Sequence, residues 1–296
     1  MQNMSLKEKL VEFLSHEART LHEIYEQFQD QKRTTIRGRL NENVGSAFRR
    51  ISRGVYLAIQ GDTKALVIEG DSWETLKEFK TGSIDAIITD HGYTCLNHHY
   101  QAGTTRERNK NKDIGFATTD MDEELLGQLF RVLKQGGHFF TFLPADAADT
   151  LDYNNAFITM ARETGFSFNK RFIWDKKRIG MGYNGRNRYE QILFFSKGER
   201  NMPNDMSVPD VLAYDTLRHD RRLHHAQKPV PLLADLIRFC SQENDVLLDP
   251  FAGSLSLTAA GFETNRHTIC IEKDQDMLKN ALRTRTAQPK LTCFCE

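Results

Sequence analysis

The sequence predicts an α/β fold built on a parallel sheet, preceded by a small N-terminal module of helices and a β-ribbon. From residue 62 onwards, short apolar runs alternate with stretches of helical periodicity, which is typical of a parallel sheet. Two of these runs, residues 84–89 and 246–248, lead directly into polar and small residues, as strands do where an open sheet binds ligands. We place a boundary near residue 61, between a domain over residues 1–61 and one over residues 62–296.

Composition places the chain among ordinary globular proteins. The 40 Lys and Arg residues balance 40 Asp and Glu residues, so the net charge gives no global indication of a nucleic-acid partner. No apolar run approaches the roughly 18 residues of a membrane span, and the N-terminus lacks a signal-peptide core. The five cysteines form no disulfide framework and no metal-ligand pattern. We therefore expect a cytoplasmic protein without a membrane segment or a metal; a homodimer stays open.

The N-terminal segment has the pattern of a winged helix-turn-helix. Residues 6–14 repeat apolar side chains at helical spacing, and Thr20 with Glu23 forms a capping-box pattern that opens a second helix. A third helix is predicted from about residue 34 towards residue 51, followed by a turn and a short strand over residues 55–58. Three helices and a β-ribbon in this order suit a recognition helix with a wing.

Cations gather on this segment. Between residues 31 and 60 there are seven cations against one acid: Lys32, Arg33, Arg37, Arg39, Arg49, Arg50 and Arg53. A face of this kind would bind DNA phosphates. The alternative is a helical packing or dimerisation module with a solvated basic face.

The remaining elements follow in order. Strands are predicted at residues 65–68, 84–89, 138–143, 246–248 and 268–271, with a strand pair at 166–174 and 189–195. Helices are predicted at residues 73–79, 123–133, 156–164, 229–240 and 255–260, with glycine C-caps at 135–137 and at Gly165. Residues 95–120 and 196–224 show no periodicity.

The strand over residues 246–248 leads into a candidate cofactor site. The small residues of Asp249-Pro250-Phe251-Ala252-Gly253-Ser254 let a ligand approach the backbone at the start of a helix. About twenty residues on, Glu272 ends the predicted neighbouring strand, where a carboxylate accepts the hydroxyls of a ribose. An ordinary strand-to-helix turn is the alternative.

Taken together, residues 65–271 resemble the DNA amino-methyltransferases, in the circularly permuted order in which the catalytic motif precedes the cofactor motif. The catalytic Asp-Pro-Pro-Tyr motif is matched by Asp90, His91, Gly92 and Tyr93. Asp71 stands at the acidic strand end that faces the cofactor adenine, and Gln227 and Lys228 lie in a segment similar to the one that holds the methionine part. The resemblance implies a Rossmann-like sheet, S-adenosylmethionine as cofactor, double-stranded DNA as partner, and a role in DNA methylation and restriction-modification.

The resemblance also implies a mechanism. Asp90 and the backbone carbonyl of His91 would accept the N–H bonds of an adenine amine and free its lone pair for attack on the sulfonium methyl. Tyr93 would stack on the base after it leaves the duplex. An Asp at the first motif position favours N6 of adenine over N4 of cytosine.

Further cations are candidates for DNA contact. Arg106 and Arg108 lie in the segment without periodicity, and Lys176, Lys177 and Arg178 belong to a second basic cluster beside Trp174. We expect Trp174 itself to be buried rather than to stack on a base. The pairs His98-His99 and His224-His225 are expected to serve surface or packing roles rather than to bind metal.

Two departures from the family pattern leave other interpretations open. His91-Gly92 replaces two prolines, so we expect a less rigid turn, and Leu255 replaces a glycine, so we expect it to crowd the methionine pocket or redirect the turn. Both changes favour, as an alternative, a catalytically impaired relative that binds DNA. Methylation of cytosine N4, of RNA or of a protein glutamine are further alternatives.

Overall fold

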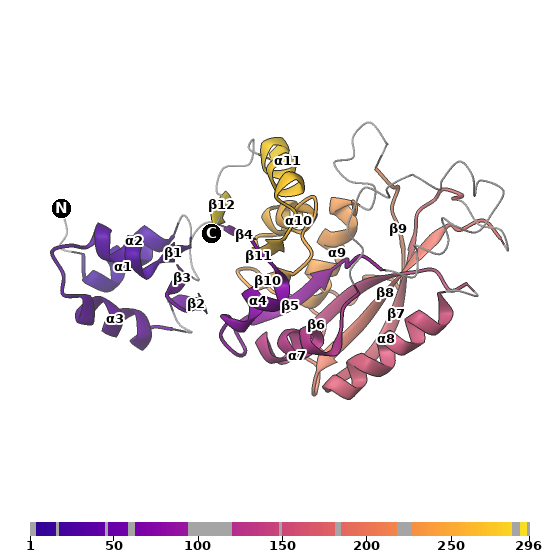
Figure 1. Ribbon diagram of the computed structural model, residues 1–296, viewed down its shortest axis with the longest axis horizontal. Helices are drawn as coiled ribbons and strands as arrows, with labels where there is room; N and C mark the ends of the chain where they lie inside the picture. Colours follow the sequence, from indigo (N-terminus) through magenta and orange to yellow (C-terminus); the bar gives the residue numbers. More distant parts are fainter. Residues whose placement is uncertain are drawn as a thin grey trace.

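A nine-stranded sheet forms the centre of the computed structural model, which describes residues 4–15, 18–44, 47–58, 63–93, 120–147, 150–180, 185–217, 227–285 and 291–294. The strand order is β12-β4-β11-β10-β5-β6-β8-β7-β9 (Figure 1). The strands are β4 (Ala65–Glu69), β5 (Ile84–Thr89), β6 (Leu133–Pro144), β7 (Phe166–Asp175), β8 (Tyr189–Lys197), β9 (Val211–Ala213), β10 (Val246–Asp249), β11 (His267–Glu272) and β12 (Leu291–Phe294). Only β8 runs antiparallel to its neighbours, so the described sheet is mostly parallel, as predicted.

Helices cover both faces of this sheet. They are α4 (Ser72–Lys77), α7 (Glu123–Val132) and α8 (Leu151–Thr164) on one face, and α9 (Val230–Cys240), α10 (Ser256–Thr264) and α11 (Gln275–Arg285) on the other. Successive strand residues alternate between the two cores: Ile87 packs with the first helix set and Ile88 with the second. The strands are therefore continuous apolar runs, because both of their faces are buried.

The N-terminal residues form a separate group beside the end of the sheet that holds β12 and β4 (Figure 1). Its elements are α1 (Leu6–Leu14), β1 (Arg19–Thr20), α2 (Leu21–Gln27), α3 (Arg33–Glu42), β2 (Phe48–Ser52) and β3 (Val55–Ala58). They enclose a cluster of their own, in which Ile24, Ile36 and Phe48 are fully buried. Thr20 and Glu23 form the predicted capping box of α2.

The N-terminal group is joined to the sheet domain through its hairpin. Ile51 is buried within the core that also holds Leu76 of α4, and its carbonyl accepts a hydrogen bond from the Lys80 amide at 3.2 Å. The predicted boundary near residue 61 lies outside the described residues.

Three expectations on local structure are wrong. The third helix ends at Glu42 rather than near residue 51, because residues 48–52 form β2 and pair with β3. The first predicted glycine C-cap is absent from α7, which ends at Val132 as the chain passes straight into β6; Gly136, with φ +76°, lies inside that strand. The segment predicted to be irregular after residue 196 contains β9, which pairs with β7.

We expect two glycine-to-alanine substitutions to change stability in opposite directions. Gly165 ends α8 with φ +116°, and an added Cβ would lie 3.0 Å from the Phe130 ring, so Gly165→Ala should lower the free energy of unfolding by about 1 kcal/mol or more. Gly127 lies inside α7 with no described atom within 4 Å of an added Cβ, so Gly127→Ala should raise it by up to about 1 kcal/mol. Urea denaturation measures both, and a destabilising Gly127→Ala would contradict this account.

Candidate active site

A cavity of about 1010 Å³ opens at the carboxyl edge of the sheet. The strands that meet there are β4, β5, β10 and β11, all parallel, so their carboxyl ends lie at the same edge. All the residues predicted as catalytic or cofactor-binding line it: Asp71, Asp90, His91, Gly92, Tyr93, Gln227, Lys228, Asp249, Phe251, Ala252, Gly253, Ser254 and Glu272. The fold thus brings together segments that are far apart in the sequence.

The two predicted halves of the cavity are joined by a hydrogen bond. Thr89 at the end of β5 donates its hydroxyl to Asp249 Oδ1 at the end of β10, at 2.7 Å, and the Phe251 amide donates to the same oxygen at 3.1 Å. Burial raises the pKa of Asp249 to about 7. This carboxyl group fixes the turn after β10 against the end of β5.

Glu272 and Asp71 line the opposite side of the cavity. Glu272 accepts the Gly253 amide at 2.7 Å and the Asp274 amide at 2.8 Å, which sets the carboxylate against the turn after β10. Burial raises the pKa of Glu272. Asp71 caps α4 through the Trp73 amide, and its hydrogen bond with Lys273 at 2.7 Å lowers its pKa.

The expectation that Leu255 crowds the cavity is wrong. Leu255 takes up a left-handed conformation with φ +57°, and its side chain is fully buried in the core under α9 and α10. Its neighbours Ser254 and Ser256 line the cavity instead. The Leu255 side chain thus points into the core and leaves the pocket open.

Asp90 lies at the centre of the catalytic half. Its Oδ1 accepts the Tyr93 hydroxyl at 2.9 Å, and its Oδ2 accepts a short hydrogen bond from Lys228 Nζ. Burial raises the pKa of Asp90, and the charge of Lys228 opposes that rise. Lys228 thus contacts Asp90, although the resemblance had assigned it to the cofactor.

Glu190 is a site residue that the sequence did not reveal. It comes from the start of β8, lines the cavity, and places Oε2 3.4 Å from Lys228 Nζ. Lys176 contacts its other oxygen at 3.3 Å. A single acid at the start of an apolar strand matches no sequence motif, which is why the sequence did not identify it. The pairing of β8 with β6 brings Glu190 to the cavity.

The turn at His91-Gly92, which we expect to be less rigid than one with two prolines, is closely packed around the His91 side chain. Its imidazole is 1% exposed, with Nδ1 3.2 Å from the Thr141 hydroxyl and Nε2 3.1 Å from the Tyr153 hydroxyl. It stacks on Phe157 with ring centroids 5.4 Å apart. Burial lowers the pKa of His91 to about 4, so the ring is neutral at pH 7 and anchors the turn without charge.

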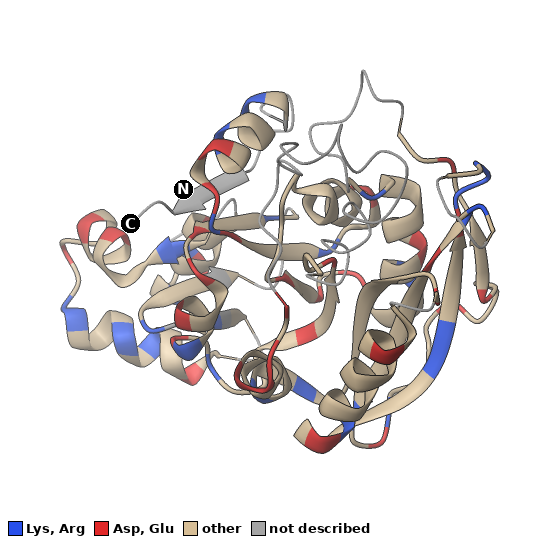
Figure 2. Ribbon diagram, turned by 45° about the vertical axis from the view of Figure 1, so that its right-hand side comes forward, with Lys and Arg blue, Asp and Glu red and all other residues tan. Residues whose placement is uncertain are grey.

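The N-terminal cations are mostly exposed on α3 and the hairpin turn, where Figure 2 shows several blue segments on one helix. Arg37 and Arg53 are exposed, whereas Arg39 pairs with Glu42 at 2.7 Å and the Arg33 guanidinium lies over the Tyr25 ring at 5.0 Å. Arg50 is partly buried, and the side chain of Arg49 lies outside the described residues, as do Arg106, Arg108 and the two histidine pairs.

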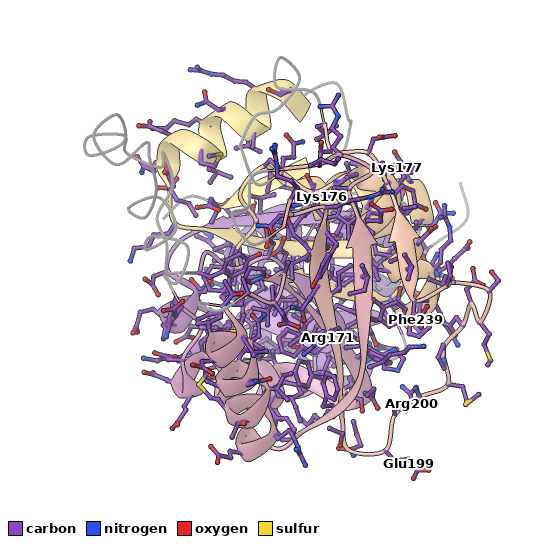
Figure 3. The ribbon with its side chains drawn as sticks, turned by 90° about the vertical axis from the view of Figure 1, so that its right-hand side faces the viewer. Arg171, Lys176, Lys177, Glu199, Arg200 and Phe239 are labelled. Carbon is purple, nitrogen blue, oxygen red and sulfur yellow. The ribbon has the colours of Figure 1, made fainter. Side chains whose placement is uncertain are left out.

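The second basic cluster is largely neutralised by acids. Lys176 contacts Glu190, and Lys177 lies 3.9 Å from Asp215, while Arg178 is exposed. In Figure 3, Lys176 and Lys177 lie together at the carboxyl end of β7, with Arg171 further back on the strand. Trp174 is 2% exposed and donates to the Tyr214 carbonyl, so its predicted burial is confirmed.

Among the described residues, no three His, Cys, Asp or Glu side chains are grouped so that they could hold a metal ion. None of the described helices combines the length and the apolar character needed to cross a membrane.

Two curated proteins illustrate the similarity in sequence. The chain is 28% identical over 211 residues to the methylase YubD of Escherichia coli (strain K12), covering 69% of this chain and 83% of that protein. It is 24% identical over 258 residues to the DNA adenine methyltransferase YhdJ of the same strain, covering 75% and 83% respectively.

Solved structures share the fold. The DNA modification methylase TTHA0409 of Thermus thermophilus, complexed with S-adenosyl-L-methionine, has a TM-score of 0.55 at 19% identity, covering 78% of this chain and 98% of that one. The PvuII DNA methyltransferase, described as cytosine-N4-specific, has a TM-score of 0.54 at 16% identity, covering 82% and 98%. The family model for N6/N4 methylases, described as "DNA methylase", matches residues 84–283. This match spans more than half of the sequence and includes both halves of the cavity, and the chain therefore belongs to the N6/N4 DNA methylase family.

Proposed function

We propose that the protein transfers a methyl group from S-adenosylmethionine to the N6 amine of adenine in double-stranded DNA. One observation carries the proposal: the acid and phenol of Asp90 and Tyr93 share a single cavity with the small-residue turn after β10 and with Glu272. A group that accepts hydrogen bonds from an amine, placed beside a site that suits a nucleoside cofactor, favours group transfer from the cofactor to the amine.

The residues on the β10 and β11 side suit an adenosyl ligand. Glu272 is a carboxylate at a strand tip, and each of its oxygens keeps a lone pair for a ribose hydroxyl beyond the backbone amide it accepts. At Gly253 no described atom lies within 4 Å of an added Cβ, so a ligand can reach the backbone there. S-adenosylmethionine, when bound, supplies an electrophilic methyl group on a sulfonium sulfur.

In this proposal Asp90 is the residue that activates the target amine. An adenine amine is a poor nucleophile because its lone pair is delocalised into the ring. A carboxylate that accepts one N–H, with the His91 carbonyl accepting the other, draws the nitrogen towards tetrahedral geometry. The anchored imidazole of His91 holds this backbone in place, and Tyr93 provides an aromatic wall for a base that has left the duplex.

Adenine is preferred over cytosine in this proposal because the motif begins with Asp90. Relatives of both kinds exist, since YhdJ is named an adenine enzyme and PvuII a cytosine-N4 enzyme. The N-terminal group, as a winged helix domain over residues 1–61, would hold the DNA through the exposed cations of α3 and the hairpin turn.

A non-catalytic DNA-binding protein is the second candidate. It is favoured by one feature: both oxygens of Asp90 already accept hydrogen bonds, from Tyr93 and Lys228. Such a protein would shift DNA in a binding assay and leave its bases unmodified.

Expression of the chain in a host without its own adenine methylation should produce N6-methyladenine in the DNA. Nucleoside mass spectrometry of that DNA distinguishes N6-methyladenine from N4-methylcytosine. N4-methylcytosine would overturn the base assignment, and the absence of either mark would favour the non-catalytic candidate.

Asp90→Ala should reduce methylation by about 10²-fold or more, because the amine loses its charged acceptor. Binding of S-adenosylmethionine, measured by calorimetry, should persist, since Asp90 does not belong to the β11 side of the cavity. Thermal denaturation controls for folding, as the substitution leaves Lys228 without this partner. Near-normal methylation by a folded variant would remove Asp90 from the mechanism.

The double substitution Arg37→Ala/Arg53→Ala should weaken DNA binding about tenfold at ~0.1 M salt and reduce the slope of log K against log salt by about 2, since each cation would neutralise one phosphate. Lys9→Ala is the matched control, because Lys9 is an exposed cation on a different helix, α1. Fluorescence anisotropy with a labelled duplex measures both. Equal behaviour of the two variants would assign DNA contact elsewhere.

A further inference from the structure

Three charged residues form a buried charge cluster at the base side of the cavity: Asp90, Lys228 and Glu190. Their side chains are 19%, 7% and 22% exposed, and Lys228 Nζ lies between the two carboxylates. Lys176 contacts Glu190 from the outer side at 3.3 Å. Charged groups are rarely kept this far from water unless they are paired.

Aromatic rings hold Lys228 at this point. Its Nζ lies 4.9 Å from the centroid of the Phe142 ring and 5.9 Å from that of Trp174. Cation–π contacts of this kind are strongest where water is excluded. The ammonium is therefore confined to a small region in which Asp90 and Glu190 are both within reach.

Both carboxylate oxygens of Asp90 already accept hydrogen bonds, and this limits how a base amine can bind. Oδ1 accepts the Tyr93 hydroxyl, and Oδ2 accepts the Lys228 ammonium. A base amine that donates to Asp90 must share or replace one of these donors. Lys228 can give way without losing an anionic partner, because Glu190 Oε2 is 3.4 Å from the same nitrogen.

The geometry points to Lys228 as a positioning residue that keeps Asp90 ionised, occupies the place of the target amine, and moves towards Glu190 when the base arrives. This inference rests on the proposed function and adds the group that prepares the acceptor. Glu190 serves in it as the second anion that retains the cation, so its role is also one of positioning.

The electrostatics of the cluster agree with this role. Burial raises the pKa of Asp90, Lys228 lowers it, and Glu190 raises it. Tyr93 donates to Asp90, Asp249 lies nearby as a further acid, and His91 is neutral at pH 7. Removing Lys228 and removing the charge of Glu190 should therefore move the titration of Asp90 in opposite directions.

The resemblance offers a different role for Lys228, namely a contact to the methionine part of the cofactor. That role predicts weaker cofactor binding when Lys228 is changed. A role at Asp90 predicts that cofactor affinity stays within about threefold while the pH dependence of methylation changes. The two roles thus differ in a measurement that does not depend on catalysis.

The test uses Lys228→Gln, Lys228→Arg and Glu190→Gln in the full chain. The fall of kcat/KM for methylation at low pH (the acid limb) reports the protonation of Asp90 in the free enzyme. Only the ionised carboxylate can accept hydrogen bonds from the amine with both oxygens free of a proton. Lys228→Gln should move this limb to higher pH by about one to three units, and Glu190→Gln should move it to lower pH. Lys228→Arg should keep the limb near its original position.

Two further measurements keep the inference testable without activity. Calorimetry with S-adenosylmethionine should give Lys228→Gln a Kd within about threefold of the unmodified protein. In thermal denaturation, the Tm loss of Lys228→Gln/Asp90→Asn should be smaller than the sum of the two single losses, because the pair is coupled.

The outcomes separate this inference from the proposed function. If the protein without substitutions methylates no DNA, the proposed function fails. Additive Tm losses in Lys228→Gln/Asp90→Asn would then overturn the inference as well. If the protein methylates DNA but the acid limb stays in place or moves the same way in Lys228→Gln and Glu190→Gln, the inference fails alone. A Kd for the cofactor raised tenfold or more by Lys228→Gln would assign Lys228 to the cofactor instead.

Discussion

The pairing of β5 with β10 is the constraint on which the site depends. Leu247 and Leu248 lie opposite Ala86 and Ile87 in parallel register, so both strands end at the same edge. The hydrogen bond from Thr89 to Asp249 then links two segments 160 residues apart. Any shift of this register would separate Asp90 from the turn after β10, because side-chain direction alternates along each strand.

Several carboxyl groups lie at this edge of the sheet, within a largely apolar interior. Asp249, Asp90 and Glu190 are carboxyl groups at or near the ends of strands that are largely apolar. Taking such groups out of water costs several kcal/mol for each unpaired ion, so each has a donor or a cation beside it. These partners offset part of the cost of desolvation, and carboxyl groups placed in this way have shifted pKa values.

Side-chain packing, rather than proline, holds the turn at His91. Prolines would restrict the turn covalently, whereas here the His91 ring is fixed by two hydroxyl groups and by stacking on Phe157. Tyr153 extends this connection to Asp120 at 3.0 Å. A motif that departs from its family pattern can thus keep a defined geometry when neighbouring helices supply the contacts.

Local patterns in the sequence determined the alternation of strands and helices, the capping box at Thr20 and the end of α8 at Gly165, and together with the family resemblance they identified many of the residues that line the cavity. They failed where strand pairing overrides local periodicity: residues 48–52 have helical spacing but pair with β3, and β9 is too short to show a pattern. Only the tertiary structure decided that Lys228, 138 residues from Asp90, pairs with it, and that Glu190 joins them. Ion pairs between distant segments depend on how strands are ordered in the sheet, and strand order leaves no periodic signal in a single sequence.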